Sequence, residues 1–344
     1  MSDFDPRTTP WQIDESEFYE VEGHNAQLAF LLRYAVLAPS SHNAQPWSFA
    51  ICDEGIAVRA DYTRRLPLAD PRDRELLMSV GASIANLRVA AAHFGYETTV
   101  MYQAREEEDL PVATVAFRET CSPAPELARL FPAITARRTN RQPFEPRTIE
   151  DPALSALCDF MDEHGKTLHF VVTHDRERIA ALIEEGDRTL MADPAFRTEF
   201  ARWIRPNVSS ATDGICGDAF GIPGPISALG PWLMRQIDIG PAQARHDRAL
   251  AQGAAGMIVV TAEDDRTSLI RAGESLERLL LMLTSLGISY SFLNQPVEVG
   301  ALRGELWAML RSPHPPQLLL RIGYAVRPVA KAMPRRPAES VVAR

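Results

Sequence analysis

Two long apolar segments of this 344-residue chain share one pattern, and this repetition constrains the fold more than any other feature. Gly81-Ala82-Ser83-Ile84 and Gly273-Glu274-Ser275-Leu276 each lie in a run of helical periodicity. Each run reaches a second glycine 14 positions later (95 − 81 = 14 and 287 − 273 = 14), where glycine can end a helix. The pattern predicts an internal duplication, although two amphipathic helices of equal length can also agree by chance.

The order of helices and strands around these two segments is repeated as well. Periodicity and turn residues predict helices over 27–38, 74–94, 151–165, 176–190 and 271–286. They predict strands over 47–52, 55–60, 97–102, 112–117, 167–173, 256–261, 289–293 and 317–322. Because the same order occurs in both halves, chance agreement becomes a weaker explanation of the two long helices.

The second half contains a long segment, about 191–245, that has no counterpart in the first half. Glycine and proline interrupt it repeatedly, at Gly214, Gly217, Gly221, Pro223, Gly224, Pro225, Gly230 and Pro231. Such a segment inside a domain is usually a lid, a binding loop or a disordered excursion. Its aromatic residues Trp203, Phe220 and Trp232 disfavour disorder. We therefore interpret it as a partly helical lid.

A polar loop follows the first predicted helix. Ala38-Pro39-Ser40-Ser41-His42-Asn43-Ala44-Gln45-Pro46-Trp47 places hydroxyl and amide side chains between a helix end and an aromatic strand. These groups can donate to and accept from the edge of a heteroaromatic ligand. They can also cap neighbouring backbone groups in an ordinary turn, and the residues alone favour this second interpretation.

Two basic clusters stand out in a chain whose net charge is −9. Arg137-Arg138-Thr139-Asn140-Arg141 places three guanidinium groups within five residues, and their fixed fork of donors suits phosphate. The second cluster is Arg327, Lys331, Arg335 and Arg336, near the C-terminus. Either cluster can instead be a solvated surface, and a frayed basic tail is the favoured interpretation of the second.

Charge and missing signatures argue against several classes of function. Net acidity disfavours a nucleic-acid partner and an anionic membrane surface, and no apolar run approaches the roughly 20 residues of a membrane span. The first 20 residues lack the pattern of a signal peptide, so a cytoplasmic location is expected. No P-loop, GxGxxG after a strand, GxSxG or HExxH occurs, and no metal site is expected.

Together these motifs resemble the nitroreductase-like flavoprotein superfamily. In that family a Pro-Ser-Ser-x-Asn-x-Gln-Pro-Trp segment of one subunit and an Arg-Arg-Ser-x-Arg segment of the other hold the same flavin. Here the segment from Pro39 to Trp47 matches the first, and Arg137 to Arg141 matches the second with Thr139 in place of serine. The resemblance implies bound FMN, with NADH or NADPH as the electron donor.

The resemblance also implies a role for each site residue. The loop residues that would border the flavin are Pro39, Ser40, Ser41, Asn43 and Gln45. The groups that would hold its phosphate are Arg137, Arg138, Thr139, Arg141, Arg335 and Arg336. Backbone near Asn294 and Gln295 would face the reactive nitrogen. The flavin carries the chemistry, so no catalytic side chain is expected.

The distribution of the two motifs implies a particular branch of the family. The Ser-Asn motif occurs only in the first half and the arginine motif only in the second, and 163–167 does not match the first motif. This resembles the Acg-like tandem branch, as does segment 64–87. The expected structure is a tandem nitroreductase-like α+β fold, an internal pseudo-dimer compatible with a monomer, with antiparallel-rich mixed sheets, surrounding helices and an inserted lid. Its expected parts are a tail over 1–20, a first repeat over 21–122 and a second repeat over 123–344 that includes the lid.

The implied activity is transfer of hydride or electrons from NAD(P)H through FMN to a small organic acceptor. A nitro compound, a quinone, an enone or a small heterocycle would all suit an apolar pocket over a flavin. One alternative is a flavin-binding or storage protein whose lid closes the site and allows little turnover. Another is a structural pseudo-dimer whose site has decayed.

Overall fold

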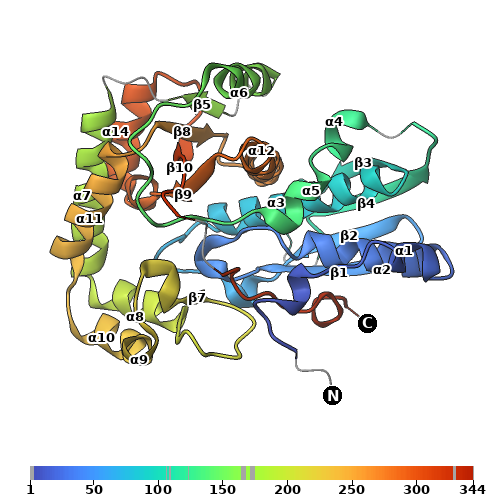
Figure 1. The fold of residues 1–344 in the computed structure, drawn as a ribbon, viewed down its shortest axis with the longest axis horizontal. Coiled ribbons are helices and arrows are strands. Elements are labelled where there is room, and N and C mark those ends of the chain that lie inside the picture. The colour runs from blue at the N-terminus through green and yellow to red at the C-terminus, as the bar shows by residue number, and fades with distance from the viewer. Residues whose placement is uncertain are drawn as a thin grey trace.

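Each half of the chain forms a four-stranded antiparallel sheet, and two long helices lie between the sheets (Figure 1). The computed structural model describes residues 4–343 except 106, 108–109, 123, 164–167, 171–174 and 328–330. The strand order is β1-β2-β4-β3 in the first sheet and β5-β8-β10-β9 in the second. With helices around antiparallel sheets, the fold is α+β, as the sequence predicts.

The strands occupy mostly the predicted segments, because alternating apolar residues mark the faces that pack on the helices. In the first sheet they are β1 (Trp47–Cys52), β2 (Gly55–Ala60), β3 (Tyr96–Tyr102) and β4 (Ala113–Glu119). In the second they are β5 (Leu168–Phe170), β8 (Gly256–Thr261), β9 (Ser289–Phe292) and β10 (Pro316–Gly323). Two short strands, β6 (Ile204–Arg205) and β7 (Ile215–Cys216), pair in parallel.

The helices fall into an inner pair and an outer set. The inner pair is α3 (Arg74–His93) and α12 (Arg266–Ser285), each 20 residues long. The outer helices beside the first sheet are α1 (Glu17–Glu20), α2 (His24–Ala35), α4 (Pro125–Ala128) and α5 (Phe131–Ala136), of which α4 and α5 belong to the second half of the sequence. Those beside the second sheet are α6 (Asp151–Glu163), α7 (Arg176–Ala192), α8 (Pro194–Arg202), α9 (Gly224–Ser227), α10 (Gly230–Gln236), α11 (Gly240–Gln252), α13 (Gln295–Glu298) and α14 (Gly300–Leu310).

Helices α3 and α12 cross at two glycines that contact each other's backbone reciprocally. A Cβ on Gly81 would lie 2.0 Å from the carbonyl oxygen of Ile270, and a Cβ on Gly273 would lie 2.0 Å from that of Met78. In each case the contacted residue precedes the opposite glycine by three positions, one helical step on the same face. The glycines therefore allow a backbone approach that no other residue could make.

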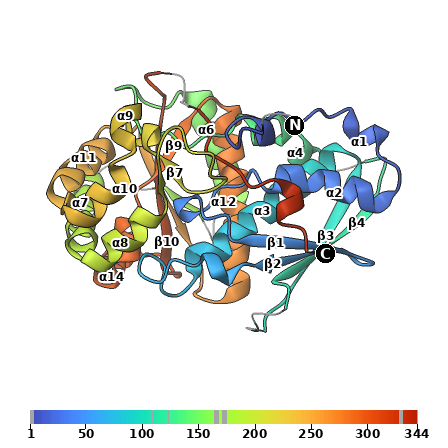
Figure 2. The same cartoon turned by 90° about the horizontal axis from the view of Figure 1, so that it is seen from below.

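The C-terminal segment carries the second half into the sheet of the first half, and the arginine motif adds to the second sheet. The C-terminal segment lies beside β1, where Phe49 and Val342 form a parallel bridge. Thr139 forms a parallel bridge with Tyr290 of β9, and the Asn140 amide donates to the Tyr290 carbonyl at 2.9 Å. In Figure 2 the C-terminal segment is seen to end among the elements of the first half. Loops from both halves therefore meet at the seam around α3 and α12.

The outer helices of the second half have no counterpart around the first sheet. Helices α7 and α11 pack side by side at the edge of the molecule opposite β1–β4, with α8, α9 and α10 beside them (Figures 1 and 2). The predicted lid boundary at residue 245 lies inside α11, which begins at Gly240. The segment without counterpart therefore ends inside α11, a helix that packs against α7.

The observed helix ends differ from the predicted ones for local reasons. Helix α2 ends at Ala35 rather than 38, and the chain turns before Pro39. Helix α12 begins at Arg266, five residues before the predicted start, because the Asp265 side chain accepts from the Ser268 amide. Helix α14 is an element that the sequence analysis did not predict. The predicted end of the helix over 151–165 and most of the strand over 167–173 lie outside the described residues.

Within the described ranges, one helix is long and apolar enough by composition to cross a membrane. It is α3, and 89% of the relevant window is buried inside the fold. Such burial is typical of a core helix, and Ser83 and Asn86 are fully buried there with the apolar residues.

Candidate functional site

A cavity of about 470 Å³ lies where the two halves meet the outer helices of the second half. Pro39, Ser40, Ser41 and His42 contribute from the first half, and Arg141, Asn294 and Gln295 from the second. The wall from the predicted lid is apolar and consists of Phe196, Phe200, Ile204, Ile215, Phe220, Ile222, Met234 and Ile239. The volume and the mix of apolar wall and few polar groups suit a small organic ligand.

The polar loop adopts a left-handed backbone conformation at three of its residues. His42, Asn43 and Gln45 have φ of 53°, 56° and 54°, a conformation that costs energy for residues with a side chain. The Gln45 amide donates to Ser40 Oγ at 2.8 Å, which closes the loop. Pro39, Ser40, Ser41 and His42 therefore border the cavity, whereas Asn43 and Gln45 lie outside its lining.

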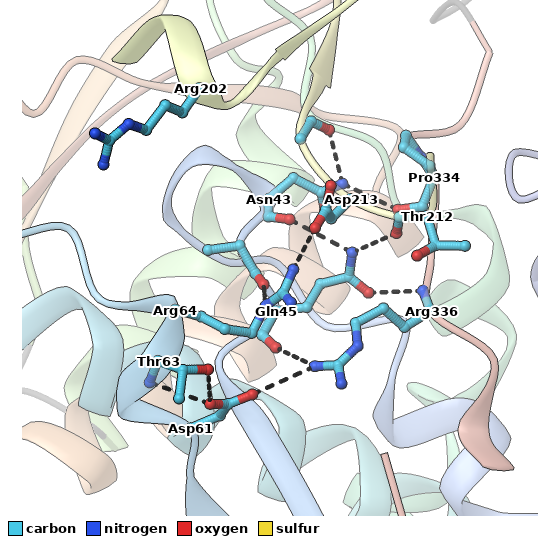
Figure 3. Close-up of polar contacts among 12 residues, drawn as sticks. Asn43, Gln45, Asp61, Thr63, Arg64, Arg202, Thr212, Asp213, Pro334 and Arg336 are labelled. Carbon is cyan, nitrogen blue, oxygen red and sulfur yellow. Dashed lines mark hydrogen bonds and ion pairs between the residues drawn. The ribbon is translucent and has the colours of Figure 1, made fainter. Parts of the chain in front are cut away.

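Asn43 and Gln45 connect the loop to two distant segments (Figure 3). Asn43 Nδ2 donates to the carbonyls of Gly214 and Pro334 at 2.9 and 3.0 Å. Gln45 Nε2 donates to the Thr212 carbonyl at 2.8 Å, and Gln45 Oε1 accepts from the Arg336 amide at 2.9 Å. Both predicted flavin contacts thus use their amides to hold the loop to the predicted lid and to the C-terminal segment.

Asp213 fastens the same stretch of the predicted lid. Its carboxylate pairs with Arg64 of the first half and accepts from Arg205 at 2.7 Å (Figure 3 shows the Arg64 pair). The pKa of Asp213 is lowered: burial opposes ionisation, but the hydrogen bonds and charges of Arg205 and Arg64 outweigh it. The segment around 212–214 is therefore held closed over the polar loop.

The arginine motif is divided between the core and the cavity. Arg137 is 2% exposed, pairs with Glu277 of α12 at 3.1 Å and donates to the Leu37 carbonyl at 2.7 Å. Arg138 lies over the Trp11 ring at 4.0 Å. Thr139 bridges to β9. Neither these two arginines nor Thr139 line the cavity.

Arg141 is the member of the motif that lines the cavity. Its guanidinium lies 5.5 Å from the Phe220 ring centroid. Within the part of the chain that the structure describes, no hydrogen bond or ion pair engages it. Burial lowers the pKa of Arg141, and the arginine remains the principal cation at the cavity wall.

The two C-terminal arginines lie behind the loop and not in the cavity lining. Arg335 is 3% exposed and donates to Asn43 Oδ1 at 2.7 Å and to the Leu37 and Ala38 carbonyls. Arg336 donates to the Gln45 carbonyl at 3.2 Å. The C-terminus is therefore an ordered part of the seam, not a frayed tail.

Buried carboxyl groups form the polar side of the cavity, and the sequence analysis did not single them out. Glu75 accepts from Ser41 Oγ, and from Asn294 Nδ2 at 3.2 Å. Burial, followed by the charge of Asp70, raises the pKa of Glu75 to about 7. Burial and the charges of Glu75 and Asp70 raise the pKa of Glu298 well above its usual value.

Asp187 of α7 and Asp247 of α11 form a second pair of carboxyl groups on this wall. Gln295 Nε2 donates to Asp187 Oδ1 at 3.1 Å and to Asp247 Oδ2 at 2.8 Å. Burial and then the charge of Asp247 raise the pKa of Asp187 to about 8. A signal was present in the sequence: Asp187 follows Ile179 and Ile183 at steps of four, on the apolar face of its helix.

Several polar atoms at the cavity lack a partner in the described part of the chain. They include His42 Nε2 and Gln295 Oε1. Burial, and then Arg141, lowers the pKa of His42 to about 4, so its imidazole is neutral. Buried polar groups are normally paired. An unpaired ring nitrogen, an amide oxygen and the Arg141 guanidinium together suit a heteroaromatic ligand with both acceptors and donors.

No family model matches the chain, but proteins named as reductases align with it over nearly its whole length. It is 29% identical over 327 residues to Acg of Mycobacterium tuberculosis, named as an NAD(P)H nitroreductase, which covers 90% of this chain and 93% of Acg. It is 25% identical over 318 residues to PigM of a Serratia species, named likewise, which covers 85% of this chain and 86% of PigM.

Solved structures of nitroreductases align more weakly. One from Anabaena variabilis gives a TM-score of 0.45 at 10% identity and covers 93% of this chain and 94% of that one. The FMN-dependent nitroreductase NfnB of Mycobacterium smegmatis, in complex with NADPH, gives 0.39 at 16% and covers 62% and 97%.

Proposed function

We propose, on the premise that this chain belongs to the nitroreductase-like superfamily in its Acg-like branch, that it is an FMN-dependent NAD(P)H oxidoreductase. The observation that carries the proposal is the cavity at the seam, which the polar loop of the first half and Arg141 of the second both line. A small organic molecule is the electron acceptor.

We further propose that the two halves, 21–122 and 123–344, form an internal pseudo-dimer with one flavin site. The reciprocal contacts of Gly81 and Gly273 support this, because each glycine makes the same approach to the other helix. The C-terminal segment also supports it, since Val342 adds a parallel bridge to Phe49 at the edge strand of the first sheet.

The residues at the cavity fit FMN at its ring. Pro39, Ser40 and Ser41 would border the ring system from the first half, and Asn294 and Gln295 from the second. Arg141 would meet its anionic or acceptor groups directly. When bound, FMN supplies hydride transfer between the nicotinamide and the acceptor.

The predicted flavin-binding residues that do not line the cavity would act on the ring site indirectly. Arg137, Arg138, Arg335 and Arg336 would contribute positive potential at the seam rather than direct hydrogen bonds, because their donors already hold backbone carbonyls or stack on rings. Thr139, Asn43 and Gln45 would keep the two motif segments in place.

The test uses the purified full chain. It should contain one FMN per chain, and NADH or NADPH added without oxygen should bleach the flavin absorbance near about 450 nm, a property of the cofactor itself. Colourless protein that takes up no added FMN would disprove the proposal. The same measurement identifies the preferred nicotinamide.

A second function, flavin binding or storage with little turnover, is favoured by one observation. The predicted lid is tied to the first half by the Asp213–Arg64 ion pair and by the hydrogen bonds of Asn43 and Gln45 in the polar loop. A lid held this way would slow nicotinamide entry. If so, bound flavin resists NAD(P)H in the native chain, and Asp213→Ala accelerates its reduction while leaving flavin content unchanged.

A further inference from the structure

Two carboxyl groups from different helices meet at the polar wall of the cavity. Asp187 on α7 is 3% exposed and Asp247 on α11 is 7% exposed, and both line the cavity. The single amide of Gln295 donates to both, at 3.1 and 2.8 Å. A Cβ on Gly186 would lie 2.7 Å from Gln295 Cβ, so the backbone of α7 brings the bridging amide close to the pair.

The pair must keep a proton at neutral pH. Two carboxylates this close in a buried site cannot both ionise, and burial raises the pKa of both aspartates. The groups that face them are Gln243 and His246 on α11, Gln295 and Glu298 on α13, Arg321 on β10, and Arg141. The charges of Arg321 and Arg141 act on Asp247, so Asp187 is the better holder of the proton.

Two hydrogen-bond acceptor atoms in the cluster of Asp187, Asp247 and Gln295 indicate that a ligand binds there. Across the described residues, Asp187 Oδ2 and Gln295 Oε1 lack a hydrogen-bond donor, apart from any proton shared with the Asp247 carboxyl. Buried acceptors are normally satisfied. Gln295 is also the residue whose backbone is proposed to face the reactive edge of the flavin, so a molecule reacting there would meet the carboxyl pair.

We propose that the Asp187–Asp247 pair donates the proton that an acceptor takes up as it receives a hydride in this cavity. The proposal rests on the proposed function for its hydride, which comes from NAD(P)H by way of bound FMN. A quinone, for example, gains a hydride and a proton to become a hydroquinone. The hydride forms the first O–H bond at one carbonyl oxygen, and the electron pair that it displaces passes through the ring to the other carbonyl oxygen. There one O–H bond of the carboxyl pair breaks as the second O–H bond of the hydroquinone forms, and the pair regains a proton from water.

Asp187→Asn and Asp247→Asn test the pair, and Glu184→Gln is the matched control. Glu184 lies one turn before Asp187 on the same helix and also contacts α11, where it pairs with Arg248, but it does not line the cavity. The three substitutions exchange a carboxyl for an amide of similar volume, so packing is preserved.

The experiment follows the oxidative half-reaction of the FMN-loaded chain. The protein is reduced with NADPH without oxygen and then mixed rapidly with a naphthoquinone or with ferricyanide, which accepts an electron and needs no proton. With the quinone, Asp187→Asn slows reoxidation by roughly 100-fold or more. Asp247→Asn slows it as well, ferricyanide rates stay within a factor of two to three, and Glu184→Gln matches the native chain. Unchanged quinone rates, or equal slowing with both acceptors, would overturn the proposal.

A second measurement does not depend on activity. Because folding raises the pKa of Asp187 to about 8 from a usual 3.8, the stabilising effect is present at low pH and is lost as pH rises through about 8. The native Tm therefore falls with rising pH, and Asp187→Asn flattens that fall. A Tm profile unchanged by Asp187→Asn would show that the pair holds no proton. Failure of NADPH to reduce the flavin would instead disprove the proposed function and leave this profile interpretable.

Discussion

The two halves of the molecule resemble each other at their centre and differ at their periphery. Each has a four-stranded sheet and a 20-residue helix that crosses the other at a glycine. Only the second half adds α7 and α11, which carry the buried aspartates of the cavity wall. The difference teaches that the central helices α3 and α12 form one side of the cavity, whereas the elements without counterpart supply the carboxyl groups of Asp187 and Asp247 to its wall.

The largest expected effect is at the helix crossing. Gly81→Ala and Gly273→Ala should each destabilise the chain by more than about 4 kcal/mol, beyond ordinary overpacking of about 1–3 kcal/mol. The obstacle in each case is a backbone carbonyl 2.0 Å from the new Cβ, so the helices must separate. Urea unfolding measures the change.

Gly304→Ala is the control for that prediction. Gly304 lies within α14, and a Cβ there would meet nothing within 4 Å. Alanine should therefore stabilise the chain by about 0.5–1 kcal/mol through helix propensity. If Gly81→Ala or Gly273→Ala behaves like this control, the central crossing does not hold the two halves together.

The next effect separates structural from ligand-binding arginines at the seam. Arg137→Met should cost about 3–5 kcal/mol in the free energy of unfolding, because it leaves Glu277 buried without its partner. Double substitution with Glu277→Leu should recover part of that loss, and recovery is measured by the same unfolding curves. A single-variant cost below about 1 kcal/mol would show that the pair is not what joins α12 to the motif.

The polar wall can be tested through pH. Folding raises the pKa of Glu75 to about 7 from a usual 4.5, so its stabilising effect is complete below pH 4.5 and disappears as pH rises through 7. The native chain should lose about 3 kcal/mol of stability across this window from Glu75, and Glu75→Gln should remove that loss. Glu126→Gln, at an exposed position on α4, should leave the profile unchanged.

The sequence predicts the core of this fold well because the core follows local rules. Strands β1, β2 and β8 occupy the predicted segments without shift, since alternating residues and turn glycines specify them locally. Helix α14 was not predicted, and α11 was placed within the lid. Both pack on α7, so their stability comes from tertiary contacts that local periodicity does not reveal.

The candidate site is predicted only in part for a similar reason. Motif matching finds Ser40, Ser41 and Arg141, which line the cavity, together with Arg137 and Arg335, whose donors are directed to backbone carbonyls. Which guanidinium of a cluster faces a cavity depends on side-chain directions that spacing does not fix. The carboxyl wall was missed because its members come from four helices and share no local pattern.

The smallest expected effect on stability is at Arg141, and it tests whether Arg141 and Arg138 play different parts within the arginine motif. Arg141→Met should change the free energy of unfolding by less than about 1 kcal/mol, since no ion pair to the described residues is lost. It should weaken FMN binding by about 10–100-fold, the value of one charge-assisted hydrogen bond of about 1.5–3 kcal/mol. Arg138→Met, three residues away in sequence but stacked on Trp11, should weaken binding less than fivefold. Affinity is measured by titrating FMN into flavin-free protein and following the quenching of flavin fluorescence. Equal losses in the two variants would mean that the motif acts through its summed charge, and that lining the cavity gives Arg141 no special role.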